Sequence, residues 1–201
     1  MSVATQAKRA AQFVRHLDRH LLRWIFGFDL WHVNRLGDRP YALRIIAYLN
    51  GLPDEQRGRV VEIGCGLGDI LRRLRFRERL GLDADRAVVR AARLLACASR
   101  YGRVRFAELT FPHPLDGRYD AIVMVNWPHL IEEERLRPQL AVYVREHLSP
   151  TGVLIVDTVQ DRAYTFNHHI EHIAPDGSSV AKLGDFERER ELWAIQAGAG
   201  R

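Results

Sequence analysis

Residues 60–68 of the chain read VVEIGCGLG, a short apolar run that ends in three alternating glycines. Such a run predicts a buried strand that leads directly into a tight turn. Glycines permit backbone angles that other residues avoid, and they leave space where a ligand must approach the backbone. The G-x-G-x-G spacing differs from the G-x-G-x-x-G pattern that holds a pyrophosphate, and no G-K-S/T follows to make a P-loop. We therefore expect this turn to bind a ligand that carries no phosphate groups.

Two acidic residues near this turn suit a nucleoside ligand. Glu62 directly precedes the glycines, where its carboxylate could meet a cationic amino group. Asp83 lies 21 residues further on, at the end of a second predicted strand, where an acidic side chain can accept hydrogen bonds from both ribose hydroxyls. A glycine loop alone is often only a turn, and an Asp after a strand is often a helix N-cap, as we expect for Asp85. Together, in this strand–helix context, the two features predict a cofactor site.

The order of predicted elements indicates an α/β fold. The predicted strands cover residues 60–63, 79–82, 104–107, 119–125 and 153–158, and the predicted helices cover residues 69–77, 86–99 and 132–147. Strands that alternate with helices form a parallel sheet with crossover helices. Residues 179–183 and 192–196 can pair as an antiparallel hairpin across the charged connection 184–191. We predict a doubly wound, mostly parallel seven-stranded sheet closed by this C-terminal hairpin.

The first part of the chain has a different character. Residues 5–50 show helical spacing, interrupted by an aromatic-rich stretch over 24–32 and a break at 37–40. We divide the chain into an N-terminal helical extension or cap, residues 1–57, and a cofactor-binding domain, residues 58–201. The candidate residues for covering the pocket are Phe28, Trp31, His32 and Tyr41, with Trp31 and His32 as possible substrate contacts. The alternative is that these aromatic residues only pack an N-terminal helix onto the sheet.

Four segments resemble a known family. Residues 60–69 closely resemble the first motif of class I S-adenosylmethionine-dependent methyltransferases, and LDAD over 82–85 resembles their acidic second-strand motif. YDAIV over 119–123 resembles the "FDxVx" fourth strand. LSPTGVLI over 148–155 resembles the "LkPGG" start of the fifth, with Thr151 in place of a glycine. The resemblance covers about residues 58–160 and implies a Rossmann-like fold with S-adenosylmethionine as cofactor and S-adenosylhomocysteine as product.

The resemblance also implies roles for individual residues. The glycines would line the methionine portion, with Glu62 at its ammonium group and Asp83 at the ribose. Glu108, after the third predicted strand, is the nearest match to a residue that contacts the adenine amino group; the alternative is an exposed loop carboxylate. Cys65 reads as a small packing residue within the loop. The expected cofactor-binding set is Glu62, Gly64, Cys65, Gly66, Gly68, Asp83, Glu108 and Asn126.

The acceptor is expected beyond the carboxyl ends of the strands, where residues 126–129 read NWPH. This stretch resembles the N-x-P-F/Y motif of amino-group methyltransferases, except that His129 replaces the aromatic residue. It also resembles the N-x-L-H-x-I/L stretch of small-molecule methyltransferases, which we favour. His129 is then a candidate base or substrate contact, and Trp127 a candidate substrate contact. The alternative is that His129 only holds the start of a helix in place.

Three histidines follow the fifth predicted strand. His168 and His172 are spaced to share one helical face, as in some metal sites. No H-E-x-x-H motif accompanies them, and we predict no metal. His168 and His169 are candidate lid or substrate contacts, and solvated loop histidines are the alternative.

Composition limits the other classes of function. The chain has 201 residues and a net charge of +5, but only two of its basic residues are lysines, and the arginines are interleaved with acids. This pattern argues against nucleic acid as a partner. Cys65 and Cys97 are too few for a disulfide framework and lack metal-site spacing. No apolar run approaches the ~18 residues of a membrane span, and no secretory signal is evident. We expect a cytoplasmic protein.

These observations predict methyl transfer to a small-molecule acceptor, either a metabolite or a saccharide-like compound. The compact chain leaves little room for a separate domain that reads nucleic acid. The first alternative is an RNA or DNA base N-methyltransferase. The second is a non-catalytic S-adenosylmethionine-binding protein that regulates an active methyltransferase. The identity of the acceptor, the atom methylated and the oligomeric state stay open.

Overall fold

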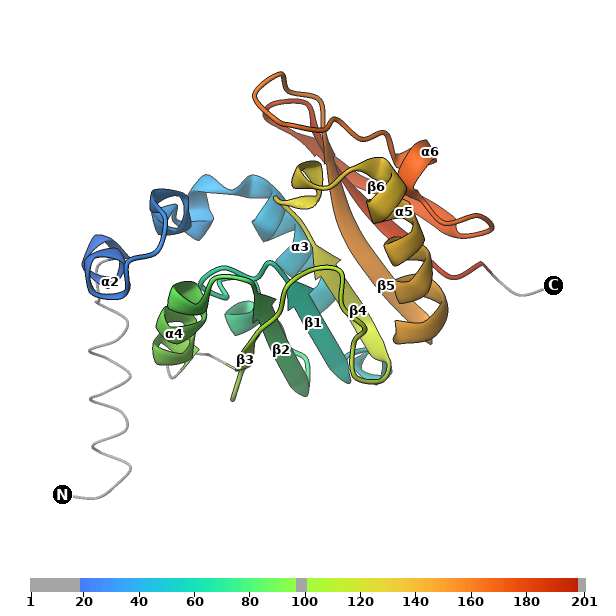
Figure 1. Ribbon diagram of the computed structural model, residues 1–201. Coiled ribbons are helices and arrows are strands. Elements are labelled where there is room, and N and C mark those ends of the chain that lie inside the picture. Colours follow the sequence, from blue (N-terminus) through green and yellow to red (C-terminus); the bar gives the residue numbers. More distant parts are fainter. Residues whose placement is uncertain (1–18, 97–100, 199–201) are drawn as a thin grey trace.

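Seven strands form one mixed sheet in the computed structural model, which describes residues 19–96 and 101–198. The strand order is β3-β2-β1-β4-β5-β7-β6 (Figure 1). Neighbours from β3 to β5 are parallel, whereas β7 runs antiparallel to both β5 and β6. The strands are β1 Arg59–Ile63, β2 Glu78–Asp83, β3 Arg105–Glu108, β4 Tyr119–Met124, β5 Leu148–Val159, β6 Ser179–Phe186 and β7 Arg190–Gln196. The predicted sheet and its closing hairpin are confirmed.

Alternation along the central strands gives the sheet two apolar faces. Val60, Val123 and Ile155 belong to one hydrophobic cluster, and their sequence neighbours belong to another. Helix α3 (Pro40–Asn50) packs on the first face, and helix α5 (Glu133–Val142) packs on the second. Helix α4 (Arg86–Leu95) connects β2 toward β3. Helices therefore cover both faces, and the fold is doubly wound as predicted.

The first described residues pack against helix α4. Helix α2 (Arg19–Phe26) contributes Leu22 to a separate cluster that also contains Phe28 and the α4 residues Val88 and Leu95. Phe28 is thus a packing residue and does not reach the ligand pocket. Two 3-10 turns, Leu30–Val33 and Leu36–Asp38, then lead into α3. The predicted helix from residue 5 to residue 18 lies outside the described residues.

The predicted helix over 69–77 is wrong, because only a 3-10 turn, Leu71–Arg73, forms there. A nine-residue helix advances about 13 Å at about 1.5 Å per residue. The chain must return past the six-residue strand β2, which spans about 20 Å at about 3.3 Å per residue. An extended stretch after the 3-10 turn covers this distance with the few residues available. The buried Arg79 side chain donates hydrogen bonds to the carbonyls of Leu71 and Leu74 at 3.4 and 3.2 Å, so these groups keep partners without a helix.

Other boundaries differ less. The predicted helix over 132–147 is α5 followed by a π-helical turn, Tyr143–His147, and the end of the predicted helix 86–99 falls outside the described residues. The hairpin connection is only residues 187–189, with positive φ at Arg188 and Glu189. A short helix α6 (Ile170–Ile173) follows β5. No helix within residues 19–96 and 101–198 has the length and apolar character to cross a bilayer.

A buried carboxylate fastens the N-terminal part to the glycine loop. Asp69 accepts hydrogen bonds from Arg19 at 2.7 and 2.9 Å, from Arg72 at 2.6 Å, and from Arg39. Burial alone would raise the pKa of Asp69, but the hydrogen bond and charge of Arg19, with the charges of Arg72 and Arg39, outweigh it and lower the pKa to about 2. Arg19 belongs to α2 and Arg39 precedes α3, so one side chain holds both segments.

Asp69→Asn should therefore destabilise the protein at pH 7. The folded pKa of about 2 lies below the ordinary aspartate pKa of 3.8, so the carboxylate contributes stability above about pH 4, and this stability is lost as the pH falls toward 2. The shift corresponds to about 2 kcal/mol at about 1.4 kcal/mol per pKa unit. Urea unfolding at pH 7 and pH 3 should show a difference between variant and wild type that shrinks at the lower pH. Asp176→Asn, at an exposed ion pair, is the matched control, and equal stability of Asp69→Asn at pH 7 would contradict the assignment.

Candidate functional site

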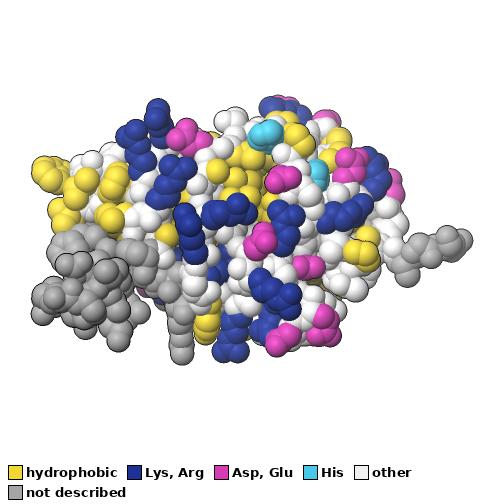
Figure 2. Space-filling view, turned by 90° about the horizontal axis from the view of Figure 1, so that it is seen from below, with side chains coloured by type: hydrophobic (Ala, Val, Ile, Leu, Met, Phe, Trp, Pro, Cys, Tyr) yellow, Lys and Arg dark blue, Asp and Glu magenta, His cyan; other side chains and the backbone are white. Residues whose placement is uncertain are grey.

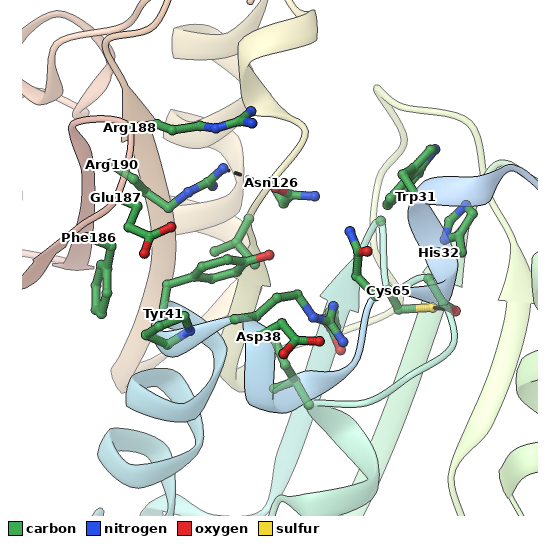
Figure 3. A pocket seen from close by; sticks show the side chains of 18 of the residues that line it. Trp31, His32, Asp38, Tyr41, Cys65, Asn126, Phe186, Glu187, Arg188 and Arg190 are labelled. Atoms are coloured by element: carbon green, nitrogen blue, oxygen red, sulfur yellow. Dashed lines mark hydrogen bonds between the residues drawn. The ribbon is translucent and has the colours of Figure 1, made fainter. Parts of the chain in front are cut away.

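A cavity of about 300 Å³ opens beyond the carboxyl ends of β1 and β4. From β1 the chain continues to β2 toward one edge of the sheet, and from β4 it continues to β5 toward the other edge. The gap between β1 and β4 is therefore the switch point where ligands bind in open α/β sheets. The cavity is lined by the glycine loop, the cap segment (residues 30–41), the residues that follow β4 (Val125 and Asn126), the loop residue Tyr164 and the turn between β6 and β7. Figure 3 shows the cap and loop side chains of Trp31, His32 and Cys65 facing Tyr41, Phe186, Glu187, Arg188 and Arg190, with Asn126 between the two groups.

The glycine loop has the backbone that its sequence predicts. Gly64 and Gly66 have φ values of +73° and +52°, in the left-handed region that favours glycine. A Cβ at Gly64 would lie 2.3 Å from the Trp127 ring, and a Cβ at Gly66 would lie 3.2 Å from Nδ1 of His32. Gly64, Cys65 and Gly66 line the cavity. Gly68 turns away from it toward Phe106.

Glu62 places a buried carboxyl group on the cavity wall. Its side chain is 5% exposed, and Oε2 has no hydrogen-bond partner. Burial raises the pKa of Glu62 to about 8; Asp69 and Asp83 add to this, and Arg39 opposes it. The group is therefore mostly neutral at pH 7, and a cation placed beside Oε2 would favour the ionised form.

Asp83 is brought to the same edge of the sheet but lies behind the cavity wall. Its Oδ2 accepts a hydrogen bond from the Gly66 amide at 2.8 Å, and its Oδ1 accepts one from the Asp85 amide at 3.0 Å. His32 stands in front of it on the cavity wall, buried and stacked on Trp31 with ring centroids 3.5 Å apart. Burial lowers the pKa of His32 although Asp83 and Asp85 oppose the shift. Asp85 caps α4 as expected, accepting from the Ala87 amide at 2.7 Å.

The opposite wall is built from three strand ends. Asn126 has a φ of +70°, and its backbone N–H donates a hydrogen bond to Oδ1 of Asp157 at 2.9 Å. Its side-chain oxygen accepts a hydrogen bond from Arg190 at 3.1 Å. Arg190 is buried, forms an ion pair with Asp157, and lies 4.7 Å from the centroid of the Tyr41 ring. Positive φ at a non-glycine residue is uncommon and is often found at ligand sites.

His129 and Tyr164 form a pair next to this wall. The centroids of their rings lie 3.9 Å apart. Tyr164 lines the cavity, whereas His129 does not. Burial, with the nearby Arg190 and His168, lowers the pKa of His129 to about 4. His129 is therefore neutral at pH 7, and its Nδ1 is buried without a partner.

The remaining predicted residues do not line the cavity. Trp127 donates to the Ile63 carbonyl at 2.6 Å, and His168 has Nε2 2.9 Å from the Ile131 carbonyl. His169 is exposed, and α6 begins only at Ile170, so His168 and His172 do not share a helical face. Glu108 is half-exposed and ion-paired with Arg86. Within the described ranges, no group of three or more His, Cys, Asp or Glu side chains could hold a metal ion.

Sequence analysis missed several residues of the cavity wall. Arg39 lies at the predicted break before α3, and Tyr164 lies in an irregular loop, where spacing carries no periodic pattern. Phe186, Arg188 and Arg190 fall within residues 184–191, which we interpreted as the charged connection of the hairpin. One signal in the sequence could have indicated Arg190. Asp157 lies near the end of β5, and a buried carboxylate requires a cationic or hydrogen-bonding partner.

Comparison with known proteins shows similarity to methyltransferases. A family model described as a methyltransferase domain matches residues 61–154. Magnesium protoporphyrin IX methyltransferase from Synechocystis PCC 6803, solved with bound SAM, has a TM-score of 0.66 and 17% identity, over 95% of this chain and 97% of that one. An S-adenosylmethionine-dependent methyltransferase from Clostridium acetobutylicum ATCC 824 has a TM-score of 0.62 and 12% identity, over 80% and 92% of the two chains.

A third structure is longer. CurJ carbon methyltransferase has a TM-score of 0.57 and 18% identity, with 77% of this chain covered and 52% of that one. The chain therefore spans about half the length of that protein. No curated protein matches this chain by sequence.

The raised pKa of Glu62 predicts a pH-dependent stability. The folded pKa of about 8 lies above the ordinary glutamate pKa of 4.5, so the folded state binds more protons between these pH values and the stability falls as the pH rises through them. Glu62→Gln imitates the neutral carboxyl and should remove this loss, on the order of 3–5 kcal/mol at about 1.4 kcal/mol per pKa unit. Urea unfolding from pH 5 to pH 8.5 measures it, with the exposed Glu55→Gln as control. A wild-type pH profile that Glu62→Gln leaves unchanged would refute the raised pKa.

Proposed function

Since this chain belongs to the class I S-adenosylmethionine-dependent methyltransferases, we propose that it methylates a small-molecule acceptor held between the cap segment and the β6–β7 turn. The observation that carries this proposal is the enclosure of the cavity. It measures about 300 Å³, at the lower end of the ~300–1,000 Å³ typical of ligand pockets. The rings of Tyr41, Tyr164 and Phe186 line it, and such rings suit the flat face of a metabolite or a sugar ring.

The residues present fit the cofactor. Glu62 has an unpartnered buried oxygen that suits the ammonium group of the methionine portion, and the bare backbone from Gly64 to Gly66 allows its close approach. We assign Asp83 to the ribose hydroxyls, which requires the His32 ring to move from its position over Gly66. Glu108 is the register partner of Asp83 on the neighbouring strand, which supports its assignment to the adenine end. We assign Cys65 to packing beneath the ligand.

The proposed chemistry depends mainly on positioning. The bound cofactor supplies a sulfonium methyl group that a nucleophile of the acceptor attacks, and holding the two in line provides most of the rate enhancement. A base is needed only if the acceptor atom is protonated, and a base is most effective when its pKa lies near the working pH. His129 has a pKa of about 4 and does not line the cavity. It is therefore better suited to orienting the Tyr164 ring than to accepting the proton of the acceptor. Residues 19–57, the described part of the segment 1–57, act as the cap over the cavity in which the reaction takes place.

The nucleic-acid alternative has less support. In the face shown in Figure 2, arginine and lysine side chains are interspersed with aspartate and glutamate. Several arginines of the chain are paired with acids, for example Arg59 and Arg105 with Glu78, and Arg145 with Glu146. A surface that binds nucleic acid by its phosphates presents clustered, uncompensated basic side chains.

The proposal is tested with S-adenosylmethionine labelled on the methyl group. The purified protein is incubated with the cofactor and either a small-molecule cell extract, total RNA or DNA. We expect label to appear in the small-molecule fraction. Label retained on RNA or DNA instead would support the N-methyltransferase alternative, and cofactor binding with no transfer to any fraction would support the non-catalytic one.

Asp83→Ala should weaken cofactor binding. Loss of hydrogen bonds to a charged group costs about 1–3 kcal/mol, which corresponds to a roughly 5- to 150-fold rise in Kd. Isothermal titration calorimetry with S-adenosylmethionine measures it, and Asp116→Ala, before β4, is a control remote from the cavity. An unchanged Kd in a folded Asp83→Ala protein would remove this residue from the site.

A further inference from the structure

The side chain of Asn126 presents only hydrogen-bond donors to the cavity. Its oxygen accepts a hydrogen bond from Arg190 at 3.1 Å. A guanidinium group donates and cannot accept, so the amide oxygen must face Arg190 and the amide nitrogen must face the other way. Figure 3 shows this nitrogen pointing away from Arg190 into the cavity. Among the described residues, no group accepts a hydrogen bond from it, so both N–H groups are available to a ligand.

The orientation of this amide is fixed before a ligand binds. The backbone N–H of Asn126 donates to Asp157 at 2.9 Å, and Asp157 also forms an ion pair with Arg190. One buried carboxylate therefore holds both the backbone of Asn126 and the guanidinium group that binds its side chain. Turning the amide round would place its NH2 group against the guanidinium group and would lose a hydrogen bond to a charged partner.

Tyr41 supplies a second donor on the cavity wall. Figure 3 shows its side chain extending into the cavity. Burial raises the pKa of Tyr41, although Arg39 and Arg190 oppose the shift, so the hydroxyl group keeps its proton at pH 7. Arg39 is hydrogen-bonded to this hydroxyl group and can only donate, which leaves the hydroxyl hydrogen for a ligand.

Among the described residues around Asn126, no side chain is suited to take a proton from the acceptor. Tyr41 is protonated and Arg190 only donates, and His129 does not line the cavity. Glu187 is an exposed residue of the β6–β7 turn and stands apart from Asn126 in Figure 3. The reacting atom must therefore be free of its proton when it arrives. A carboxyl group meets this condition with an ordinary pKa of about 4, whereas a phenol keeps its proton until about pH 10.

We propose that Asn126 and Tyr41 hold the carboxylate of the acceptor, so that the protein converts a small-molecule carboxylic acid into its methyl ester. This inference rests on the proposed function and gives Asn126 a contact with the acceptor in place of the cofactor contact expected from the sequence. A carboxylate oxygen forms a bond to the methyl carbon as the carbon–sulfur bond breaks. The electron pair of that bond stays on sulfur, so the products are the ester and neutral S-adenosylhomocysteine, and no proton is transferred.

An amino group fits this wall poorly. Its own N–H hydrogens would face the NH2 group of Asn126 and the hydroxyl hydrogen of Tyr41, because the Asn126 oxygen is already bound to Arg190. A site built for one hydrogen-bond pattern rejects an analogue that leaves its polar groups unpaired. The rings of Phe186 and Tyr164 line the same cavity and suit the apolar body of the acid.

The test uses the stability of the product toward base. The protein is incubated with methyl-labelled S-adenosylmethionine and a small-molecule cell extract, and the labelled products are then treated with dilute sodium hydroxide. Base hydrolyses a methyl ester and releases the label as volatile methanol, whereas methyl ethers and N-methyl amines keep it. We expect most of the label to become volatile. Label that stays on the products overturns the inference, and absence of label from the small-molecule fraction would instead refute the proposed function.

Asn126→Asp tests the residue itself. Aspartate has the same size, tolerates the left-handed backbone and keeps an oxygen for Arg190, but it turns a second oxygen toward the carboxylate. The rate of volatile-label formation should fall about 10- to 100-fold, the range of a lost hydrogen bond to a charged group, while the Kd of S-adenosylhomocysteine changes less than about 2-fold. Calorimetry measures this Kd, and the product is used because its sulfur is uncharged. Asn167→Asp, the same change at an exposed position outside the cavity wall, should behave as wild type.

The outcomes separate contact with the acceptor from other roles. An unchanged rate in Asn126→Asp would mean that this residue serves only to bind Arg190, and the inference is overturned. A rate loss matched by an equal loss of S-adenosylhomocysteine affinity places Asn126 at the cofactor and overturns it as well. Tyr41→Phe removes only the hydroxyl group and should also slow ester formation. If Asn126→Asp does not fold, a normal rate in Tyr41→Phe overturns the inference.

Discussion

A hydrogen bond from the Gly66 amide to Oδ2 of Asp83, 2.8 Å long, joins the turn after β1 to the end of β2. Two further amides of the same turn, from Gly64 and Cys65, donate to the Leu82 carbonyl at 2.8 and 3.0 Å. These bonds hold the loop open in left-handed conformations that only glycine adopts easily. The cavity exists because this bare turn stands at the point where the sheet reverses its strand order.

The cap depends on the same loop for its position. Asp69 follows the last glycine and binds arginines from two N-terminal segments, so a change in the loop is transmitted directly to the cap. The cap in turn places His32 over Gly66 and stacks Trp31 on it. The cap residues and the glycine-loop residues that line the cavity are thus joined through the buried carboxylate of Asp69, which stays ionised because the guanidinium groups of Arg19, Arg39 and Arg72 contact it.

Charge within the cavity is arranged in two groups. Near the glycine loop, Glu62 is neutral until a cation arrives, and Arg39 retains a free donor. On the opposite wall, Asp157 neutralises the buried Arg190, which then orients Asn126 and lies over the ring of Tyr41. A zwitterionic cofactor at the first group and an aromatic or sugar-like acceptor at the second would each meet complementary surroundings.

The sequence by itself determined the doubly wound sheet, the glycine loop with Glu62, and Asp83 at the end of β2. Each of these is a local pattern: alternating apolar residues, glycine spacing, or an acid directly after a strand. Only the tertiary structure decided which side chains face the cavity. It brought in Arg39 and Arg190 from distant segments, placed His129 behind Tyr164, and replaced the helix expected over 69–77 with a 3-10 turn. These outcomes depend on crossover length and on packing between segments far apart in the chain, and local periodicity carries no information about either.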